Sequence, residues 1–545
     1  LFRPGRSTMP TLEFKGKQHI YAHHLTVPYR PLVPDAGKSL HPAEADDNLI
    51  LHGDNLHALK ALLPRYAGKV KCIYIDPPYN TGNEGWIYND NVNSPLMQQW
   101  LKDNSPVDGE DLERHDKWLC MMWPRLHLLR ELLADDGVIF VSIDDNEQHH
   151  LRMVMDEIFG EGNLIGQFAW KKRSGANDAQ NKVSIDHEYI ICYAKEDVTL
   201  EGIEKDFSRY TNPDNDVRGP WTFGDLTCNK TAIERPNLSY SLTDPATGVT
   251  FECNSNRVWV FESDRMQRAI ADGKVIFPAN GKGTPKYKRH LSEVQSNRKP
   301  FSSWMETEMN FVATRKLREI LQDQRFDYPK SVDLIKQLIA QGSSQDEIIL
   351  DSFAGSGATA HAVLALNKED GGNRKFILVE CEDYADTITA ERVRRVINGV
   401  PGARDKALQE GLGGSFTYCT LGNPIDVEGM LTGESLPDYA QLAAYLLHTA
   451  AGLSASGGLD PQNDNGLFYR NGDTDYYLLY RPEIHWLRSN EAVLNEQQAR
   501  RIHAIGRKAR VFAADKFMSQ RFLSDLGITF CQIPYELHRN GSGGR

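Results

Sequence analysis

Along this chain, short continuous apolar runs alternate with longer amphipathic stretches. Runs that predict buried strands occupy residues 49–52, 71–75 and 138–143. Apolar residues at helical spacing predict helices over 56–63 and about 116–134, the second kinked by Pro124. Strands that alternate with helices are typical of a mostly parallel sheet covered on both faces, so we expect an α/β fold.

The rhythm breaks once and then resumes. Residues 200–325 are rich in Asn, Asp, Pro and Gly, which predicts an inserted, loop-rich domain. After about residue 400 the alternation of strands and helices fades, with helices expected over 439–453 and 497–509 and a strand over 476–480. We therefore expect an N-terminal arm, a first α/β half, the insertion, a second α/β half and a C-terminal α+β domain at residues 1–47, 48–199, 200–325, 326–400 and 401–545.

A glycine-rich turn lies between a predicted strand and a predicted helix, at Asp351-Ser-Phe353-Ala-Gly355-Ser-Gly357-Ala-Thr359. Glycines let a backbone turn tightly and approach a ligand above a helix N-terminus. Glu380, at the end of the next predicted strand, is placed to accept hydrogen bonds from a ribose. A helix cap and a dinucleotide site, through Gly355-x-Gly357-x-x-Ala360, remain alternatives, because this motif alone does not separate adenosine ligands.

A second motif, Asp76-Pro77-Pro78-Tyr79, follows the predicted strand 71–75. Two prolines fix the backbone and remove two N–H donors, which leaves carbonyl acceptors beside a carboxylate. That arrangement suits an exocyclic amine, which has two hydrogens to donate, and the Tyr ring can stack on the heterocycle that carries it. The alternative is a rigid surface turn.

Together these motifs resemble the amino-methyltransferases of DNA, with the catalytic motif before the cofactor loop in the permuted order of the β group. The closer resemblance is to the modification (Mod) subunits of type III restriction systems. It covers about residues 9–400 and rests on segments 23–29, 76–82, 140–147, 155–160, 187–190, 218–225 and 328–330. One departure is Ser331, where the family usually has Pro, although Ser can cap the following helix.

The resemblance implies a Rossmann-like methyltransferase fold with a mostly parallel seven-stranded sheet and S-adenosylmethionine as cofactor. It implies that a flipped adenine stacks on Tyr79, while Asp76 and the Pro77 carbonyl accept its N6 hydrogens. The expected cofactor-binding residues are Asp351, Phe353, Gly355, Gly357, Thr359, Glu380, Asp54, Asn55 and Lys330. For Asp54, capping of the helix that follows is an equally good interpretation.

The net charge of −12, from 62 Lys and Arg against 74 Asp and Glu, argues against nucleic acid if taken alone. The predicted insertion, however, holds a basic stretch with one acid, Glu293. We expect it to contact DNA phosphates with steep salt dependence, the alternative being a solvated charged face. The candidate DNA-binding residues are Lys274, Lys282, Lys286, Lys288, Arg289, Arg298 and Lys299.

Composition excludes several other classes. No apolar run approaches the length of a membrane span, and residues 1–10 contain no apolar core of a secretory signal. The eight cysteines are never closer than 25 positions, so neither a Cys-based metal site nor a disulfide framework is expected, and the setting should be reducing and cytoplasmic.

The expected partners are double-stranded DNA, a second copy in a homodimer and a restriction-helicase (Res) subunit. The apolar run 442–453 is either an interface or core. The alternatives are methyl transfer to cytosine N4, RNA or a glutamine side chain, a non-catalytic DNA-recognition subunit, and a dehydrogenase. The intact Asp76-Pro-Pro-Tyr79 argues against a non-catalytic subunit, and the fading alternation after 400 argues against a dehydrogenase.

Overall fold

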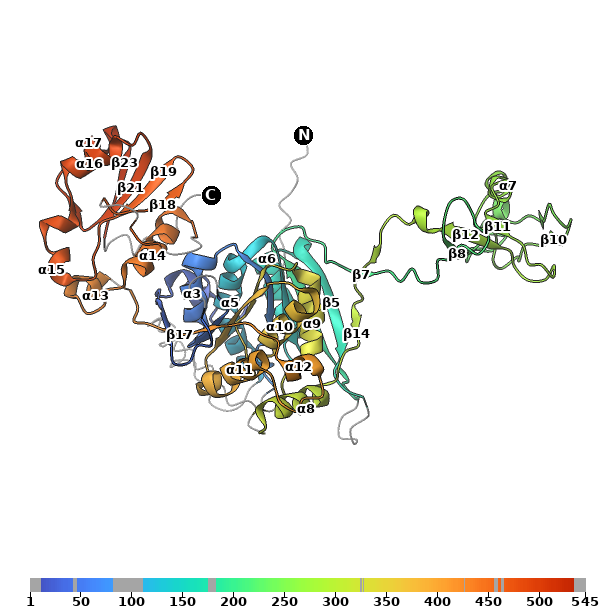
Figure 1. Cartoon of the computed structure of the whole chain (residues 1–545), viewed down its shortest axis with the longest axis horizontal. Coiled ribbons are helices and arrows are strands. Elements are labelled where there is room, and N and C mark those ends of the chain that lie inside the picture. The colour runs from blue at the N-terminus through green and yellow to red at the C-terminus, as the bar shows by residue number, and fades with distance from the viewer. Residues whose placement is uncertain are drawn as a thin grey trace. The chain divides into compact units, whose positions relative to one another are not determined.

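The computed structural model describes residues 11–42, 47–81, 111–174, 183–323, 326, 328–425, 427–454, 459–461 and 465–533. The chain forms two compact units, one made of residues 1–200 and 302–545 and the other of residues 201–301 (Figure 1). Among the described residues, no helix has the length and apolar character needed to cross a membrane.

The first unit is built on a ten-stranded sheet. Its strands, in spatial order, are β1 (Leu32–Pro34), β17 (Thr417–Leu421), β2 (Leu49–His52), β16 (Lys375–Glu380), β15 (Ile348–Asp351), β3 (Val70–Ile75), β4 (Leu133–Ile143), β6 (His187–Ala194), β5 (Leu164–Lys171) and β14 (Trp304–Met305).

Six neighbouring strands, β17 to β4, run parallel, and β6 is antiparallel to both β4 and β5. The central strands are buried on both faces because they are continuous apolar runs. The seven strands from β2 to β5 form the predicted mostly parallel sheet. β17 and β1 extend it at one edge, and β14 extends it at the other.

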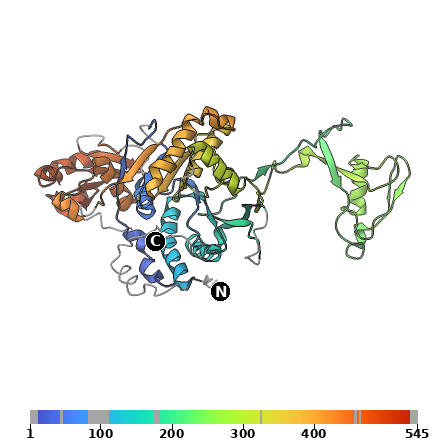
Figure 2. The same ribbon diagram turned by 90° about the horizontal axis from the view of Figure 1, so that it is seen from below.

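Helices cover both faces of the sheet. One layer contains α3 (Asn55–Tyr66), α5 (Asp111–Leu132) and α6 (Gln148–Phe159), and it packs on the face that carries Ile73 and Ile139. α9 (Val332–Gly342) and α10 (Ala358–Asp370) cover the other face, where Gly342 lies against Val138, Phe140 and Cys72. Figure 2 shows the blue to cyan layer and the yellow to orange layer on opposite sides of the strands.

Several smaller helices belong to the same unit. In the N-terminal arm, α1 (Lys17–Ile20) and α2 (His23–Thr26) pack against α5. After β16 come α11 (Glu391–Asn398), which follows a π-helical turn at Asp386–Ala390, and α12 (Lys406–Glu410).

The sequence placed the end of the insertion at about residue 325, but the second unit ends at Phe301. Residues that follow belong to the first unit: β14 pairs with β5, and α8 (Asn310–Leu321) packs on α11. The reason is the buried apolar face of α8, formed by Ala313, Leu317, Ile320 and Leu321.

The second unit has little regular structure. Its elements are β7 (Ile203–Glu204), β8 (Trp221–Asp225), β9 (Leu242–Thr243), β10 (Thr250–Phe251), α7 (Ser263–Ala271), β11 (Val275–Ile276), β12 (Lys286–His290) and β13 (Arg298–Lys299). β11, β12 and β8 form its largest sheet, and a small core gathers around Leu226, Leu242, Trp259 and Met266.

The C-terminal region contains α13 (Val427–Thr432), α14 (Tyr439–Ala451), β18 (Leu467–Asn471), β19 (Thr474–Leu478), α15 (Ile484–Leu487), β20 (Val493–Leu494), α16 (Glu496–His503), β21 (Lys508–Ala513), β22 (Asp515–Lys516), α17 (Gln520–Asp525) and β23 (Ile528–Gln532). β19, β21 and β23 are parallel and connected through α16 and α17. The expectation that strand–helix alternation fades after 400 is therefore wrong, and residues 508–509 begin a strand instead of ending a helix. The buried leucines of α14 are core.

Candidate active site

The two sequence motifs lie side by side in the structure. β15 carries the glycine-rich turn at its carboxyl end, β3 carries the Asp76–Tyr79 turn at its carboxyl end, and the two strands are parallel neighbours. β16, which ends in Glu380, is the neighbour of β15 on its other side. Carboxyl ends of parallel strands meet at one edge, which is where open α/β sheets bind ligands.

The glycine-rich turn has a shape that side chains would disturb. Gly355 and Gly357 have φ of 52° and 77°, in the left-handed region that glycine adopts without strain. A Cβ on Gly357 would lie 3.1 Å from the carbonyl oxygen of Thr389, so the close approach also requires glycine. The Gly355 N–H donates to Glu380 Oε2 at 2.7 Å, which ties this turn to the end of β16.

Two carboxyl groups at this turn have raised pKa values. Asp351 Oδ2 accepts from Thr359 Oγ1 at 2.5 Å, and its Oδ1 accepts from the Phe353 N–H at 3.0 Å. Burial raises the pKa of Asp351 to about 7 and that of Glu380 to about 7. Neither carboxylate forms an ion pair among the described residues, so this part of the site lacks a compensating cation.

The Asp76–Tyr79 tetrapeptide has hydrogen-bond partners on its backbone and on its side chains. The Pro78 carbonyl accepts from Trp118 Nε1 at 2.7 Å, whereas the Pro77 carbonyl has no hydrogen-bond partner among the described residues. Tyr79 Oη donates to Asp76 Oδ1 at 2.8 Å. An acceptor carboxylate and a second acceptor carbonyl therefore remain on a fixed backbone, as the chemistry of an exocyclic amine requires.

A charged network surrounds Tyr79. Lys330 Nζ lies 2.5 Å from Tyr79 Oη, 2.6 Å from Glu188 Oε2 and 3.3 Å from Asp76 Oδ1. Lys172 Nζ donates to the other oxygen of Glu188 at 3.0 Å. Lys330 thus joins Asp76 to a second carboxylate, and its Nζ also lies 4.9 Å from the centre of the Tyr79 ring.

Burial and charge set the protonation of this network. Burial raises the pKa of Asp76, although 26% of its side chain is exposed, and Lys330 offsets part of that rise. Burial alone would lower the pKa of Lys330, but Asp76 and Glu188 outweigh it and raise that pKa. Burial likewise favours neutral Glu188, yet Lys330 and Lys172 lower its pKa, so Glu188 is the ionised partner.

The residues expected from the end of β2 have structural partners. Asp54 Oδ1 accepts from the His57 N–H at 3.0 Å and caps α3, and Arg125 lies 3.6 Å from its other oxygen. Asn55 is buried, accepts from Arg125 Nε and donates to the Ser352 carbonyl at 3.4 Å. Asn55 therefore links β2 to the glycine-rich turn, and cofactor contact by either residue stays a prediction.

The predicted DNA-binding residues all lie in the second unit, but their charged neighbours differ. Four are paired with carboxylates: Lys274 with Glu293, Lys286 with Asp225, Lys288 with Asp214 and Asp216, and Arg298 with Glu201. Lys288 is also buried. Lys282, Arg289 and Lys299 are exposed and form no ion pair with any residue that the structure describes. DNA binding by this set stays a prediction.

Sequence reasoning missed several residues of the site. Glu188 lies near the start of β6 and Lys172 directly follows β5. Sequence reasoning noted Glu188 only within segment 187–190 and assigned neither residue a role at this site. Phe326 and Tyr384 pack at right angles with ring centres 5.6 Å apart, and Phe326 lies beside Gly355. The Glu380 carboxylate helps burial to raise the pKa of Tyr384, which places that ring beside the acid. No spacing rule connects these four residues in the sequence.

The mostly parallel sheet and the pairing of a glycine-rich turn with an acid on the next strand define a Rossmann-like fold. Residues 70–391 match the DNA methylase family. The StyLTI Mod subunit of a type III restriction-modification enzyme from Salmonella typhimurium is 33% identical over 80% of this chain and 70% of its own length. The EcoPI Mod subunit from Escherichia phage P1 is 30% identical over 72% of this chain and 69% of its own length. The type II methyltransferase M.KpnI from Klebsiella pneumoniae is 32% identical over 64% of this chain and 83% of its own length.

The chain belongs to the DNA methylase family and is a Mod-like DNA methyltransferase. This confirms the predicted fold class, the methyltransferase activity on DNA and S-adenosylmethionine as the cofactor. The dehydrogenase and the non-catalytic recognition subunit are not favoured.

Proposed function

We propose that this protein methylates N6 of a flipped adenine at a specific site in duplex DNA, with Asp76, Pro77, Pro78 and Tyr79 as its catalytic residues. The observation that carries the proposal is the position of Asp76, which directly follows β3, next to the strand β15 that leads into the glycine-rich turn. The methyl donor and the acceptor amine would therefore bind at adjacent strand ends, the arrangement that in-line transfer needs.

The hydrogen bonds around Asp76 suggest how the amine enters. Tyr79 Oη is within reach of two carboxylates, Asp76 at 2.8 Å and Glu188 at 3.2 Å. When an adenine N6 hydrogen takes the place of the Tyr79 hydroxyl at Asp76, the hydroxyl can donate to Glu188 instead. Asp76 and the Pro77 carbonyl then accept both N6 hydrogens, which directs the nitrogen lone pair toward the methyl group.

Most of the cofactor residues of this proposal lie at the ends of β15 and β16. The Phe353–Gly357 turn supports S-adenosylmethionine, and Glu380 accepts from its ribose hydroxyls in place of the Gly355 N–H. The rings of Phe326 and Tyr384 flank the same turn and offer apolar surface to the adenine of the cofactor. The Thr359 hydroxyl donates a hydrogen bond to the Asp351 carboxylate, and this bond stabilises the start of the turn.

The test compares Asp76→Asn with Asp136→Asn in the full chain. Asp136 is a matched control, since it lies on the neighbouring strand β4 and its side chain is 74% exposed. We expect Asp76→Asn to abolish transfer of labelled methyl groups to duplex DNA while cofactor binding persists, and Asp136→Asn to retain activity. Nucleoside chromatography of the product should show N6-methyladenine. Normal activity of Asp76→Asn would refute the catalytic assignment, and N4-methylcytosine would refute the target.

We further propose that the chain acts as a homodimer and cooperates with a Res subunit, since its relatives include Mod subunits of type III restriction-modification enzymes. The 201–301 unit would read the DNA site. It holds fifteen Lys or Arg and thirteen Asp or Glu, a net charge of +2 in a chain of −12, so its charge suits DNA better than the rest does. Light scattering of the purified protein at several concentrations tests the dimer, for which a monomer throughout would be the contrary result.

A further inference from the structure

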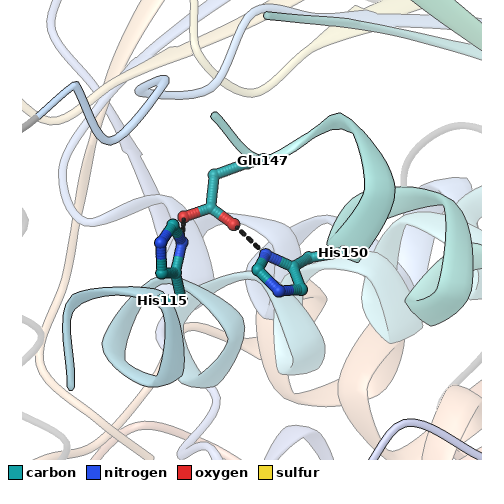
Figure 3. A group of neighbouring side chains, drawn as sticks. All are labelled: His115, Glu147 and His150. Carbon is teal, nitrogen blue, oxygen red and sulfur yellow. Dashed lines mark hydrogen bonds and ion pairs between the residues drawn. The ribbon is translucent and has the colours of Figure 1, made fainter. Parts of the chain in front are cut away.

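A second cluster of polar side chains lies away from the strand ends that would hold the cofactor. His115 of α5 and His150 of α6 both face Glu147, the residue that precedes α6. His115 Nδ1 is 2.6 Å from Glu147 Oε1, and His150 Nδ1 is 2.8 Å from Glu147 Oε2 (Figure 3). The Glu147 side chain is fully buried, whereas each imidazole is 22% exposed, so the cluster can be reached from solvent.

The donor set is that of a transition-metal site. Two imidazole nitrogens and one carboxylate suit Zn²⁺, Fe²⁺ or Ni²⁺, whereas Mg²⁺ and Ca²⁺ prefer oxygen ligands. The ligand atoms all lie within 4.8 Å of one another. Atoms that each bind one ion at about 2.1 Å lie about 3 Å apart. The two nitrogen–oxygen separations, 2.6 and 2.8 Å, therefore need to open by only a few tenths of an ångström, and the two imidazole nitrogens, at most 4.8 Å apart, need to close toward the same distance.

The backbone supports this grouping. Glu147 and His150 are three residues apart across the start of α6, which brings both side chains to one side of the helix. His115 projects from a different helix, so the three donors converge from two rigid elements. Glu147 Oε1 also accepts from Asn80 Nδ2, which fixes the orientation of the carboxylate, as a neighbouring hydrogen bond does for many metal-binding groups.

We propose that His115, Glu147 and His150 bind one divalent transition-metal ion and that this ion anchors the catalytic turn. Asn80 follows Tyr79 directly and holds a φ of 60°, a conformation that needs support from its surroundings. Its amide bonds Glu147, so the ion would fix the chain just after the tetrapeptide to α5 and α6. The ion lies outside the reaction itself, and the proposal does not depend on which base is methylated.

Metal binding by the chelator-treated full chain tests the proposal, with Zn²⁺ measured by calorimetry and Co²⁺ by its visible absorption. We expect one ion per chain and a loss of affinity of about tenfold or more in both His115→Ala and His150→Ala. His149→Ala is the matched control, since His149 precedes His150 on α6 and is exposed. Equal binding by the wild type and the His115→Ala/His150→Ala variant would overturn the site, and so would the absence of binding.

A measurement on the unmodified protein covers the case in which a variant fails to fold. Diethylpyrocarbonate modifies accessible imidazoles, and mass spectrometry of the digested protein reports each histidine separately. Zn²⁺ should protect His115 and His150 and leave His149 reactive. Equal modification of His115 and His150 with and without Zn²⁺ would show that the cluster is held by hydrogen bonds alone.

Discussion

Removal of the Lys330 ammonium should change the pH at which the enzyme works. Lys330 is the only cation that contacts Asp76 among the described residues, at 3.3 Å from Oδ1. Glu188 keeps a second cation, Lys172, at 3.0 Å. In Lys330→Met, Asp76 therefore bears most of the lost stabilisation and holds its proton to higher pH.

The size of the effect follows from the separation of the charges. Two unit charges about 4 Å apart at an effective dielectric constant of about 20 interact by about 4 kcal/mol. One pKa unit corresponds to about 1.4 kcal/mol, so the pKa of Asp76 should rise by about two to three units. In the proposed mechanism the ionised form of Asp76 accepts the amine hydrogens. Activity is therefore lost as the pH falls through this pKa, and a higher pKa moves that loss to higher pH.

The assay is the rate of methyl transfer to duplex DNA between about pH 6 and pH 9. We expect the acidic limb for Lys330→Met to move up by about two units, with a rate that is lower at neutral pH and recovers toward pH 9. Lys336→Met is the control, since Lys336 pairs with the exposed Glu369. An unshifted limb with a uniformly lower rate would refute the idea that Lys330 sets the charge of Asp76.

Three further outcomes are expected. The ionised Glu380 accepts hydrogen bonds from ribose hydroxyls better than its neutral form does. The affinity for S-adenosylmethionine should therefore increase as the pH rises through about 7. In calorimetry, Glu380→Gln should remove this pH dependence, while the control variant Glu382→Gln should keep it. Lys282→Ala and Arg289→Ala should each reduce the slope of the logarithm of DNA affinity against the logarithm of salt concentration by about one. Lys286→Ala should reduce it by less, since Asp225 already neutralises Lys286. Equal slopes for all three variants would contradict phosphate contact. Ser331→Ala should lower the free energy of unfolding in urea by about 1 kcal/mol, because Ser331 Oγ accepts from the Leu334 N–H at the start of α9; unchanged stability would show that the cap contributes nothing.

Much of the fold could be predicted because several continuous apolar runs are followed or ended by a carboxylate. The runs before Asp76, Asp351 and Glu380 predicted three parallel strands, and their carboxyl ends do meet. Only one strand of the C-terminal sheet was predicted, over 476–480, which overlaps β19, whereas residues 508–509 of β21 were assigned to a helix. The end of the insertion was misplaced because β14 has only two residues and gives no recognisable pattern.

The charged partners of the site could not be predicted from spacing. Glu188 lies 109 positions from Tyr79 along the sequence, and Lys330 lies 251 positions from it. Glu188 reaches the site because β6 is antiparallel to its neighbours and therefore begins at the edge where the parallel strands end. A sequence pattern shows that a strand exists but not its direction in the sheet, and the direction decides whether its first or last residue faces the site.

Charge divides the active site into two halves with different requirements. At the tetrapeptide, Asp76 and Glu188 are balanced by Lys330 and Lys172, so this half is already neutral before a substrate binds. At the glycine-rich turn, Asp351 and Glu380 have pKa values of about 7 and no ion-pair partner among the described residues. A neutral purine suits the first half, and a positively charged sulfonium cofactor suits the second. Because the cofactor loses its sulfonium charge when the methyl group leaves, electrostatic attraction in the second half favours the donor over the demethylated product.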